Sequence, residues 1–444
     1  MASEKSFVDL AALLRLRSRK PRAFGPRDRS GGSSMGKPGW LRGCLVASSF
    51  LAVASPAYAQ TPDKPRISDG IVKLGVLTDM SGSYADYSGE GSLTAVKMAV
   101  EDFGGSVAGV PIKVVAADHQ HKTDVGVSIA RTWYDVEQVD AILDVSNSAV
   151  ALAVMNVTKE KNKIVMLGGV STPKVTTDSC TPNSIQYIYD ANALSNVVGK
   201  ALVRQGGSSW YFLTVDFAFG HGLEKTTADV VRAGHGKVVG SARFPLNTVD
   251  FSSYLLQAQA SQAKVVALAS AGADTINAIK GAAEFGLAAG DQRVATLLTF
   301  ITDVHSMGLD QAQGLLLATA FYWDLDDETR RWSRRFFERV HRMPTMVQAG
   351  MYSAAMHYLK SVAETGTDDA TVTMQNMKSR PINDFFSRGG HIRSDGLHVH
   401  DMLMMEVKQP KDSKYPWDYY SFRSRVSADE AFSPPVEGAC AAAR

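Results

Sequence analysis

Short apolar runs alternate with amphipathic segments from Ile71 to about residue 320 of this 444-residue chain. Within 92–103, for example, Leu93, Val96 and Val100 fall on one face of a helix. Strands that alternate with helices of roughly 10–15 residues are typical of βαβ units and parallel sheets. Nine strands are many for one sheet, so the pattern predicts an α/β fold with two doubly wound, Rossmann-like lobes. The predicted strands are 71–77, 112–117, 141–145, 164–167, 210–215, 238–244, 265–269, 294–298 and 315–320.

After residue 322 the pattern changes to consecutive helices, followed by a segment typical of antiparallel strands between Gly390 and Phe422. We expect the chain to build one lobe, cross to a second lobe and return, so that close-spaced crossings form a hinge. A ligand would then lie between the lobes. The predicted helices are 328–341, 347–365 and 370–378; lobe 1 is predicted at 60–189 and 323–392, lobe 2 at 190–322 and 393–434, and a C-terminal tail at 435–444.

The N-terminal region has the features of a secretory leader. Lys37 and Arg42 precede an apolar run at 44–54, and Ala57-Tyr58-Ala59 fits the small-x-small pattern that signal peptidase cleaves. The run is too short to span a membrane. We therefore predict cleavage after Ala59 and a mature protein in the periplasm. Translation from Met1 and translation from Met35 both remain open.

The charge balance argues against a nucleic-acid partner. The first 59 residues contain ten of the 47 Lys and Arg residues but only three of the 45 Asp and Glu residues. The remaining chain therefore has 37 basic and 42 acidic residues, a net charge of −5. Nucleic-acid binding needs a concentrated basic face.

Two of the three cysteines, Cys180 and Cys440, remain after the leader is removed. In an oxidising compartment, two cysteines predict one disulfide, which would tie the C-terminal end to a loop far upstream. The alternative is two unrelated buried thiols.

Small and hydroxyl residues recur directly after the predicted strands. In open α/β sheets, ligands bind at the carboxyl ends of strands, beside helix N-termini that attract anions. The aromatic residues Tyr84, Tyr87, Phe217 and Phe219 lie in the same loops and would supply apolar walls. The pattern predicts a pocket for a carboxylate attached to an apolar body. The alternative is that the hydroxyl residues are only helix caps. The loops are 78–83, 146–148, 168–173, 216–220 and 270–274.

Four segments together resemble the leucine/isoleucine/valine-binding family of periplasmic receptors. They are 71–87, the turn at 144–150, Gly220 after paired aromatics, and 343–354; the resemblance extends over 68–430. It implies the type I periplasmic-binding-protein fold, a small amino-acid or carboxylate ligand, and a membrane permease of an ABC importer as partner. It implies neither a catalytic residue nor a cofactor or metal.

The resemblance also assigns site residues. The α-carboxylate-binding groups of the family fall on Ser146, Asn147, Ser148, Val170 and Ser171, its aromatic residues on Tyr87 and Phe219, and a segment near the cleft on Tyr187 to Asp190. The acid that binds the ammonium group is replaced by Ser270-Ala-Gly-Ala, and the nearest acid is Asp274, in the next predicted helix. An aromatic or aliphatic carboxylate without an amine is therefore an alternative to an amino acid.

Other functions rest on weaker patterns. Ser171-Thr-Pro-Lys174 matches the Ser-x-x-Lys motif of serine hydrolases, but the partner motifs of those enzymes are missing. The pairs His119/His121 and His398/His400 would suit a metal, although histidines at strand ends more often have structural roles. The basic run 330–342 predicts an amphipathic helix with a solvated face, or a contact with the importer. A sensory receptor subunit with the same fold is a further alternative.

Overall fold

The computed structural model of the protein describes residues 67–287 and 291–440, so the predicted leader and its cleavage site lie outside the described residues. Four strands of the first sheet, β1, β4, β5 and β6, are almost completely buried, as expected for parallel strands between two helical layers. Val72, Leu74 and Val76 join one hydrophobic core, and Leu77 joins the other. The strand order is β2-β3-β1-β4-β5-β6, and every pairing except β2–β3 is parallel. The bounds are β1 (Val72–Thr78), β2 (Ser106–Val107), β3 (Val110–Asp118), β4 (Ala141–Asp144), β5 (Ile164–Leu167) and β6 (Ser184–Gln186).

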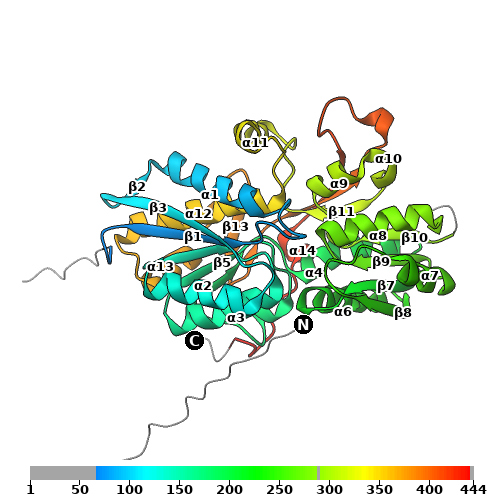
Figure 1. Ribbon diagram of the computed structural model, residues 1–444, viewed down its shortest axis with the longest axis horizontal. Coiled ribbons are helices and arrows are strands. Elements are labelled where there is room, and N and C mark those ends of the chain that lie inside the picture. Colours follow the sequence, from blue (N-terminus) through cyan, green and yellow to red (C-terminus); the bar gives the residue numbers. More distant parts are fainter. Residues whose placement is uncertain (1–66, 288–290, 441–444) are drawn as a thin grey trace, which may run out of the picture. The chain divides into compact units, whose positions relative to one another are not determined.

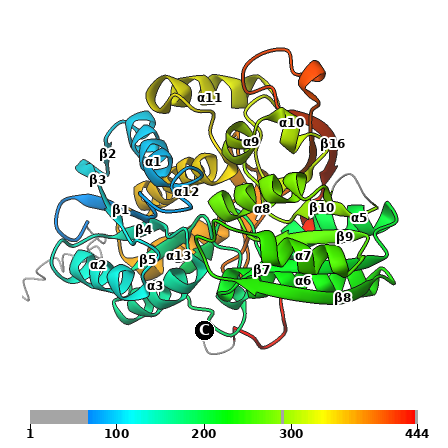
Figure 2. The ribbon, with the colours of Figure 1, turned by 45° about the vertical axis from the view of Figure 1, so that its right-hand side comes forward.

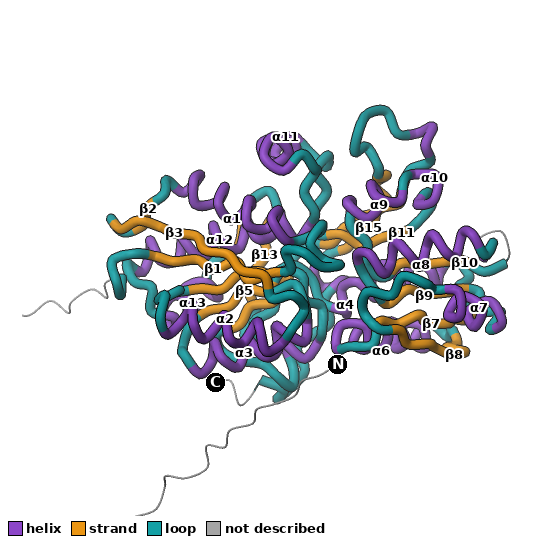
Figure 3. Tube along the Cα trace, in the orientation of Figure 1, coloured by secondary structure: helices purple, strands orange, loops and turns teal. Residues whose placement is uncertain are grey.

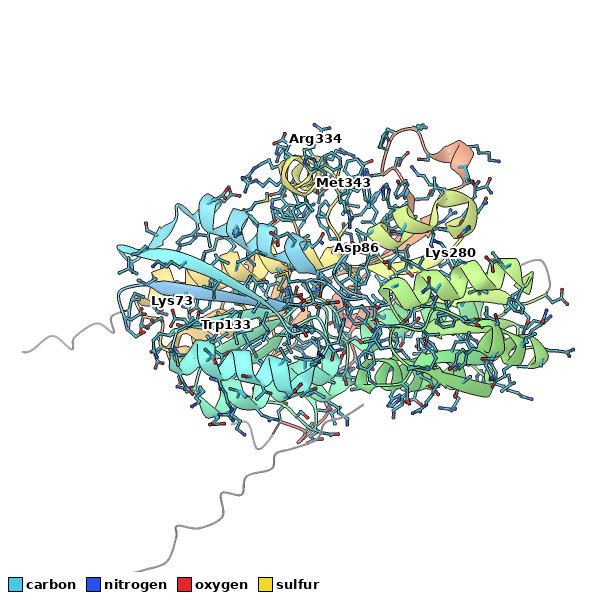
Figure 4. The ribbon with its side chains drawn as sticks, viewed as in Figure 1. Lys73, Asp86, Trp133, Lys280, Arg334 and Met343 are labelled. Carbon is cyan, nitrogen blue, oxygen red and sulfur yellow. A yellow bond between two sulfur atoms is a disulfide. The ribbon has the colours of Figure 1, made fainter. Side chains whose placement is uncertain are left out.

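Helices cover both faces of this sheet (Figures 1 and 3). α1 (Gly89–Phe103) packs with α12 (Met346–Thr365) in the larger core, whereas α2 (Thr123–Asp135) and α3 (Ser148–Glu160) pack in the smaller core on the opposite face. Trp133 of α2, labelled in Figure 4, packs against β1 so closely that a side chain at Gly75 would collide with its ring.

The second sheet has the order β10-β9-β7-β8, and all of its pairings are parallel. Its central strands β7 and β9 are almost completely buried, and Figure 2 shows the sheet among its three helices. The bounds are β7 (Ser209–Val215), β8 (Lys237–Phe244), β9 (Val265–Ala269), β10 (Arg293–Thr296), α6 (Ala218–Ala233), α7 (Ser252–Ala260) and α8 (Gly272–Glu284).

Smaller elements complete the described chain. A π-helical turn, Ser195–Gly199, joins α4 to α5, and the last strands form two antiparallel sheets of three strands, β11-β15-β16 and β12-β13-β14. The bounds are α4 (Ala191–Leu194), α5 (Lys200–Arg204), α9 (Ile301–Met307), α10 (Leu309–Ala312), β11 (Leu316–Thr319), α11 (Asp327–Val340), α13 (Ala370–Ser379), β12 (Ile382–Asn383), β13 (Arg388–Ile392), β14 (His398–Val399), β15 (Met402–Val407), β16 (Tyr420–Val426) and α14 (Ala428–Ala431).

All nine predicted runs form strands, and the three predicted helices match α11, α12 and α13 closely. One prediction was wrong. The run 315–320 does not belong to a doubly wound sheet, because β11 pairs antiparallel with β15. A short buried apolar run does not distinguish a parallel from an antiparallel partner. β6 was missed because Ser184-Ile-Gln186 contains a single apolar residue.

The amphipathic character predicted for the basic run is confirmed. Trp332 and Phe336 of α11 are buried, whereas Arg335 and Arg339 pair with Asp102 (2.6 Å) and Glu101 (2.8 Å) on α1. Arg334, labelled in Figure 4, lies on the exposed side of the helix. Two of the five arginines of α11 therefore attach the helix to α1.

Two chain segments that link the sheets run side by side. The Nδ1 atom of His398 lies 2.9 Å from the Tyr187 carbonyl, and Nε2 of His400 lies 2.9 Å from the Ile188 carbonyl. An isolated β-bridge between Gln186 and Leu397 continues this contact. The residue boundaries of the two lobes remain a prediction.

The predicted disulfide between Cys180 and Cys440 is confirmed, with a Cα–Cα distance of 5.5 Å. It closes a covalent loop across 260 residues. Among the described residues, none of the helices is both long enough and apolar enough to cross a membrane.

Candidate ligand-binding site

The turn after β4 has a strained backbone. Asp144 and Val145 have positive φ angles of 79° and 52°, and a β-branched residue such as valine rarely adopts this conformation. The Ser146 hydroxyl lies 2.9 Å from Thr78 Oγ1 and accepts a hydrogen bond from the Asp79 amide at 3.2 Å. Ser146, a predicted ligand residue, thus uses its hydroxyl to join the loops that follow β1 and β4.

α3 begins directly after this turn and carries groups suited to an anion. Asn147 caps the helix, because its Oδ1 accepts hydrogen bonds from the Ala149 and Val150 amides at 2.9 and 3.1 Å. The hydroxyls of Ser148, the first residue of α3, and of Ser171, in the loop after β5, are buried and lack a hydrogen-bond partner within the described part of the chain. A buried hydroxyl without a partner is costly, and a ligand oxygen would satisfy both.

Aromatic rings lie next to this anion-binding end. The rings of Tyr84 and Tyr87 are 5.1 Å apart, and Tyr87 stacks on Phe300 with a centroid distance of 4.1 Å. Phe219 meets Tyr84 edge-on at 6.5 Å, and Phe217 lies 5.8 Å from Phe219. The predicted residues Tyr87, Phe217 and Phe219 therefore belong to one aromatic group. Phe300 was not predicted, although its loop, Thr299-Phe-Ile-Thr302, carries hydroxyl residues like the other strand ends.

A carboxyl group from the second sheet lies near the aromatic group. Asp274, in the first turn of α8, is fully buried; its Oδ2 accepts a hydrogen bond from the Asn247 amide at 3.3 Å, and its Oδ1 lacks a partner among the described residues. Burial raises the pKa of Asp274 to about 6, although backbone hydrogen bonds and the nearby His121 act to lower it. Burial, and then the Asp274 charge, raise the pKa of Tyr84 well above its ordinary value, which places the two side chains close together.

Backbone contacts bring the loops of the two sheets together at this point. The Ala273 amide donates to the Ser83 carbonyl at 3.4 Å, and the Ser83 hydroxyl donates to Asn247 Oδ1. Gly272 has a φ of +59°, and a Cβ at this position would collide with the Ser83 carbonyl. The contact therefore requires glycine at the start of α8.

Four other predicted site residues use their polar groups inside the fold, so these groups have partners without a ligand. The partners are Gln186 Nε2 for the Val170 carbonyl (2.9 Å), Ser353 Oγ for the Tyr187 hydroxyl (2.9 Å), the Ala193 amide for the Asp190 carboxylate (2.7 Å) and Thr275 Oγ1 for the Ser270 hydroxyl (2.7 Å).

Tyr189, inside the predicted segment 187–190, lies near the aromatic group. Its hydroxyl is buried and has no partner among the described residues, and it contributes to the raised pKa of both Tyr84 and Tyr87. Burial, followed by the charge of Asp144, raises the pKa of Tyr189 itself. The backbone bends at Ile188, between Tyr187 and Tyr189.

The Ser-x-x-Lys motif does not form a catalytic pair. Ser171 Oγ has no hydrogen-bond partner in the described part of the chain. Lys174 is exposed and lines a separate cavity of about 920 Å³ between the 172–178 loop, α6 and the C-terminal segment 433–439. Activating a serine requires a base within hydrogen-bond distance. The arrangement of these two residues therefore lacks the geometry of a hydrolase.

The two histidine pairs have structural partners. His121 contacts Asp79 and Asn147, and His398 and His400 contact backbone carbonyls. In the part of the chain that the structure describes, no three His, Cys, Asp or Glu side chains are grouped to hold a metal ion.

The fold and the site define a class: an α/β protein with two parallel sheets whose strand-end loops meet around unpaired polar groups, as in a protein that binds a small solute. Residues 71–414 match the family described as periplasmic binding protein, and the chain belongs to this family. Members of this family bind solutes and are not enzymes. A comparison with curated protein sequences gave no match.

Solved structures agree with this assignment. A periplasmic binding protein from Burkholderia mallei is 48% identical, with a TM-score of 0.81, and the match covers 82% of this chain and 97% of that chain. A branched-chain amino acid ABC transporter periplasmic ligand-binding protein from Burkholderia xenovorans is 42% identical, with a TM-score of 0.74 and the same coverage. An ABC transporter solute-binding protein from Rhodopseudomonas palustris, in complex with 3,4-dihydroxybenzoic acid, shares the fold at 19% identity, with a TM-score of 0.73 over 81% of this chain and 98% of that chain.

Proposed function

We propose that this protein is the solute-binding component of an ABC importer and that its ligand is an amino acid with an apolar side chain. After cleavage behind Ala59 it would act in the periplasm, deliver its ligand to a membrane permease and need no cofactor. One observation carries the choice of ligand: among the described residues, the buried hydroxyls of Ser148 and Ser171 lack a hydrogen-bond partner, and the Asp274 carboxyl is only half paired.

An amino acid in its zwitterionic form matches both ends. Its carboxylate would accept hydrogen bonds from Ser148 and Ser171 beside the N-terminus of α3, where the helix dipole favours negative charge. Its ammonium group would donate to Oδ1 of Asp274. Because an opposite charge favours the ionised form, the bound ligand would lower the pKa of Asp274 from about 6.

The Burkholderia xenovorans relative supports an amino acid, because its description names a branched-chain amino acid transporter and it is 42% identical. The aromatic group of Tyr84, Tyr87, Phe219 and Phe300 would contact the ligand's side chain. Ligand binding would then favour the arrangement in which the loops of both sheets touch, because only that arrangement supplies both ends of the site.

A second candidate is an aromatic carboxylate without an amine. The stacked pair Tyr87–Phe300 and the edge-on ring of Phe219 favour a flat apolar ligand. This candidate leaves Oδ1 of Asp274 without a partner, so we rank it second.

A thermal-shift screen distinguishes the two candidates. We expect apolar amino acids to raise the melting temperature of the wild-type protein by several degrees, because a ligand that binds only the native state stabilises it. Benzoate, 4-hydroxybenzoate and short aliphatic acids should have little effect.

The variant S148A/S171A should lose most of the amino-acid shift, and Ser306→Ala, whose hydroxyl bonds the Thr302 carbonyl inside α9, serves as control. A shift with benzoates and none with amino acids would select the second candidate. No shift with either class would contradict the proposed function.

A further inference from the structure

The turn after β3 holds His121 against groups that belong to the candidate site. Gln120 and His121 have positive φ angles of 53° and 56°, and the His121 side chain is 9% exposed. Two consecutive non-glycine residues in this conformation are unfavourable, and such strain persists mainly where a turn positions a functional group.

One ring nitrogen of His121 contacts the buried carboxylate of Asp79. Its Nε2 lies 2.6 Å from Asp79 Oδ2, which also accepts from the Tyr84 amide at 2.8 Å, while Oδ1 accepts from the Gly82 amide at 2.7 Å. Burial acts to raise the pKa of Asp79, but His121 and the two amides outweigh it and lower the pKa to about 2. An ionised carboxylate only accepts hydrogen bonds, so Nε2 carries the proton and donates.

The second ring nitrogen contacts the cap of α3. In an imidazole with its proton on Nε2, Nδ1 is an acceptor, and Asn147 Nδ2 donates to it at 3.0 Å. This contact fixes the orientation of the Asn147 amide, so that Oδ1 faces the Ala149 and Val150 amides. The chain of contacts Asp79–His121–Asn147 thereby links the loops after β1, β3 and β4.

Two further contacts hold the ring. The His121 amide donates to Nδ1 of His119, a buried histidine whose pKa is lowered to about 4 by burial and then by His121. The edge of the ring meets Tyr84 with a centroid distance of 4.7 Å. A Cβ at Gly82 would contact both the Asp79 carboxylate and the His121 ring, so the loop after β1 is shaped around this pair.

We propose that His121 is a positioning residue for ligand binding, which holds Asn147, and through it the N-terminus of α3 and Ser148, in the orientation that binds the ligand's carboxylate. This inference rests on the proposed function. It explains why the contacts Asp79–His121–Asn147 connect three loops, and why the strained turn after β3 places a histidine between the other two side chains.

Calorimetric titration with the amino acid that gives the largest thermal shift tests this role. His121→Phe removes both ring hydrogen bonds and should weaken binding at least tenfold. His121→Gln keeps one donor and one acceptor and should bind within about threefold of wild type. His235→Phe is the matched control, because His235 is an exposed histidine with a φ of 62°.

A double-mutant cycle separates positioning from a general loss of packing. Asn147→Ser keeps a good helix cap but is too short to reach His121. If His121 acts through Asn147, the double variant H121F/N147S should bind no more than about threefold more weakly than H121F alone. Wild-type affinity in H121F, no rescue by H121Q, or fully additive losses would each overturn the proposal.

An NMR measurement on the ligand-free protein tests the positioning role of His121 independently of the proposed function. Long-range ¹H–¹⁵N spectra should show His121 protonated at Nε2 and unprotonated at Nδ1 in the wild type, and a change in the Nδ1 shift in N147S. A proton on Nδ1, or no response to N147S, would contradict the inference even if no amino acid binds. Normal spectra with no ligand binding would instead count against the proposed function alone.

Discussion

At the scale of single residues, the candidate site is defined by polar groups that the fold leaves unpaired. Buried hydroxyl and carboxyl oxygens normally have partners, and leaving one without a partner typically costs about 1–3 kcal/mol. Ser148, Ser171, Tyr189 and Asp274 each carry such an atom within the described chain. We infer that these unpaired groups lower the stability of the ligand-free protein and are available to bind a ligand.

Asp274 allows a direct test of this loss of stability. Its pKa in the fold is about 6, above the ordinary value of 3.8. Between about pH 4 and pH 6 the carboxyl is therefore protonated in the folded protein but ionised in the unfolded chain. The Asp274 carboxyl therefore lowers the stability of the ligand-free wild type as the pH rises from about 4 to about 6. Asp274→Asn lacks this contribution, whereas other buried carboxyls with a raised pKa, such as Asp144 and Asp303, act in both proteins. At pH 7.5 we expect the variant to be about 2–3 kcal/mol more stable to denaturant than the wild type.

The difference between Asp274→Asn and the wild type should disappear near pH 3, where the carboxyl is protonated in both states. Asp310→Asn, at an exposed acid at the start of α10, serves as control. Equal stability of wild type and Asp274→Asn at pH 7.5 would show that burial of this carboxyl carries no cost.

The sequence alone predicted part of this residue pattern. Hydroxyl residues after strands identified Ser148 and Ser171, and the search for an acid identified Asp274. Tyr189 was included only as part of the segment 187–190, because its role depends on a bend at Ile188. Phe300 was not found, because its role depends on a loop that packs across from Tyr87. His121 was considered only as a metal ligand, since spacing does not reveal which neighbours a side chain meets.

At the scale of elements, the alternation of apolar runs and amphipathic segments was sufficient to predict the βαβ order, because a strand buried on both faces needs an uninterrupted apolar run. Strand pairing depends on the whole chain and was harder to predict from the sequence, as the antiparallel pairing of β11 with β15 shows. The start of α8 was also not predictable from the sequence, where Gly272 resembles an ordinary first residue of a helix. In the fold, the Ser83 carbonyl leaves no space for a side chain at Gly272.

Gly272→Ala therefore tests the contact between the loops of the two sheets. The added methyl would collide with the Ser83 carbonyl, so we expect ligand affinity to fall at least tenfold. Gly286→Ala is a matched control, because Gly286 also has a positive φ, +67°, but within the described chain no atom lies within 4 Å of an added Cβ. Both substitutions introduce the same backbone strain of about 1 kcal/mol.

Titration calorimetry of both glycine variants provides the measurement. A loss of affinity in G272A but not in G286A would assign the effect to the contact at Ser83. An equal loss in both variants would assign it to backbone strain and would count against a role of this contact in binding.

At the scale of the whole molecule, the chain has the properties that a solute-binding protein needs. Two parallel sheets supply strand-end loops that meet at one buried cluster, and two linking segments are joined by His398 and His400 contacts. The disulfide attaches the C-terminal segment to the loop that contains Cys180. The remaining question is whether the cluster binds both charged ends of one ligand.

Titration calorimetry with one matched pair of ligands tests most directly whether the cluster binds both charged ends of a ligand. The pair is the amino acid that binds best and the carboxylic acid with the same carbon skeleton but no amine, each titrated into wild type and Asp274→Asn. We predict that the wild type prefers the amino acid by about 100-fold, or roughly 3 kcal/mol, and that the preference largely disappears in the variant. An amine-free acid that binds the wild type as tightly as the amino acid would contradict the account.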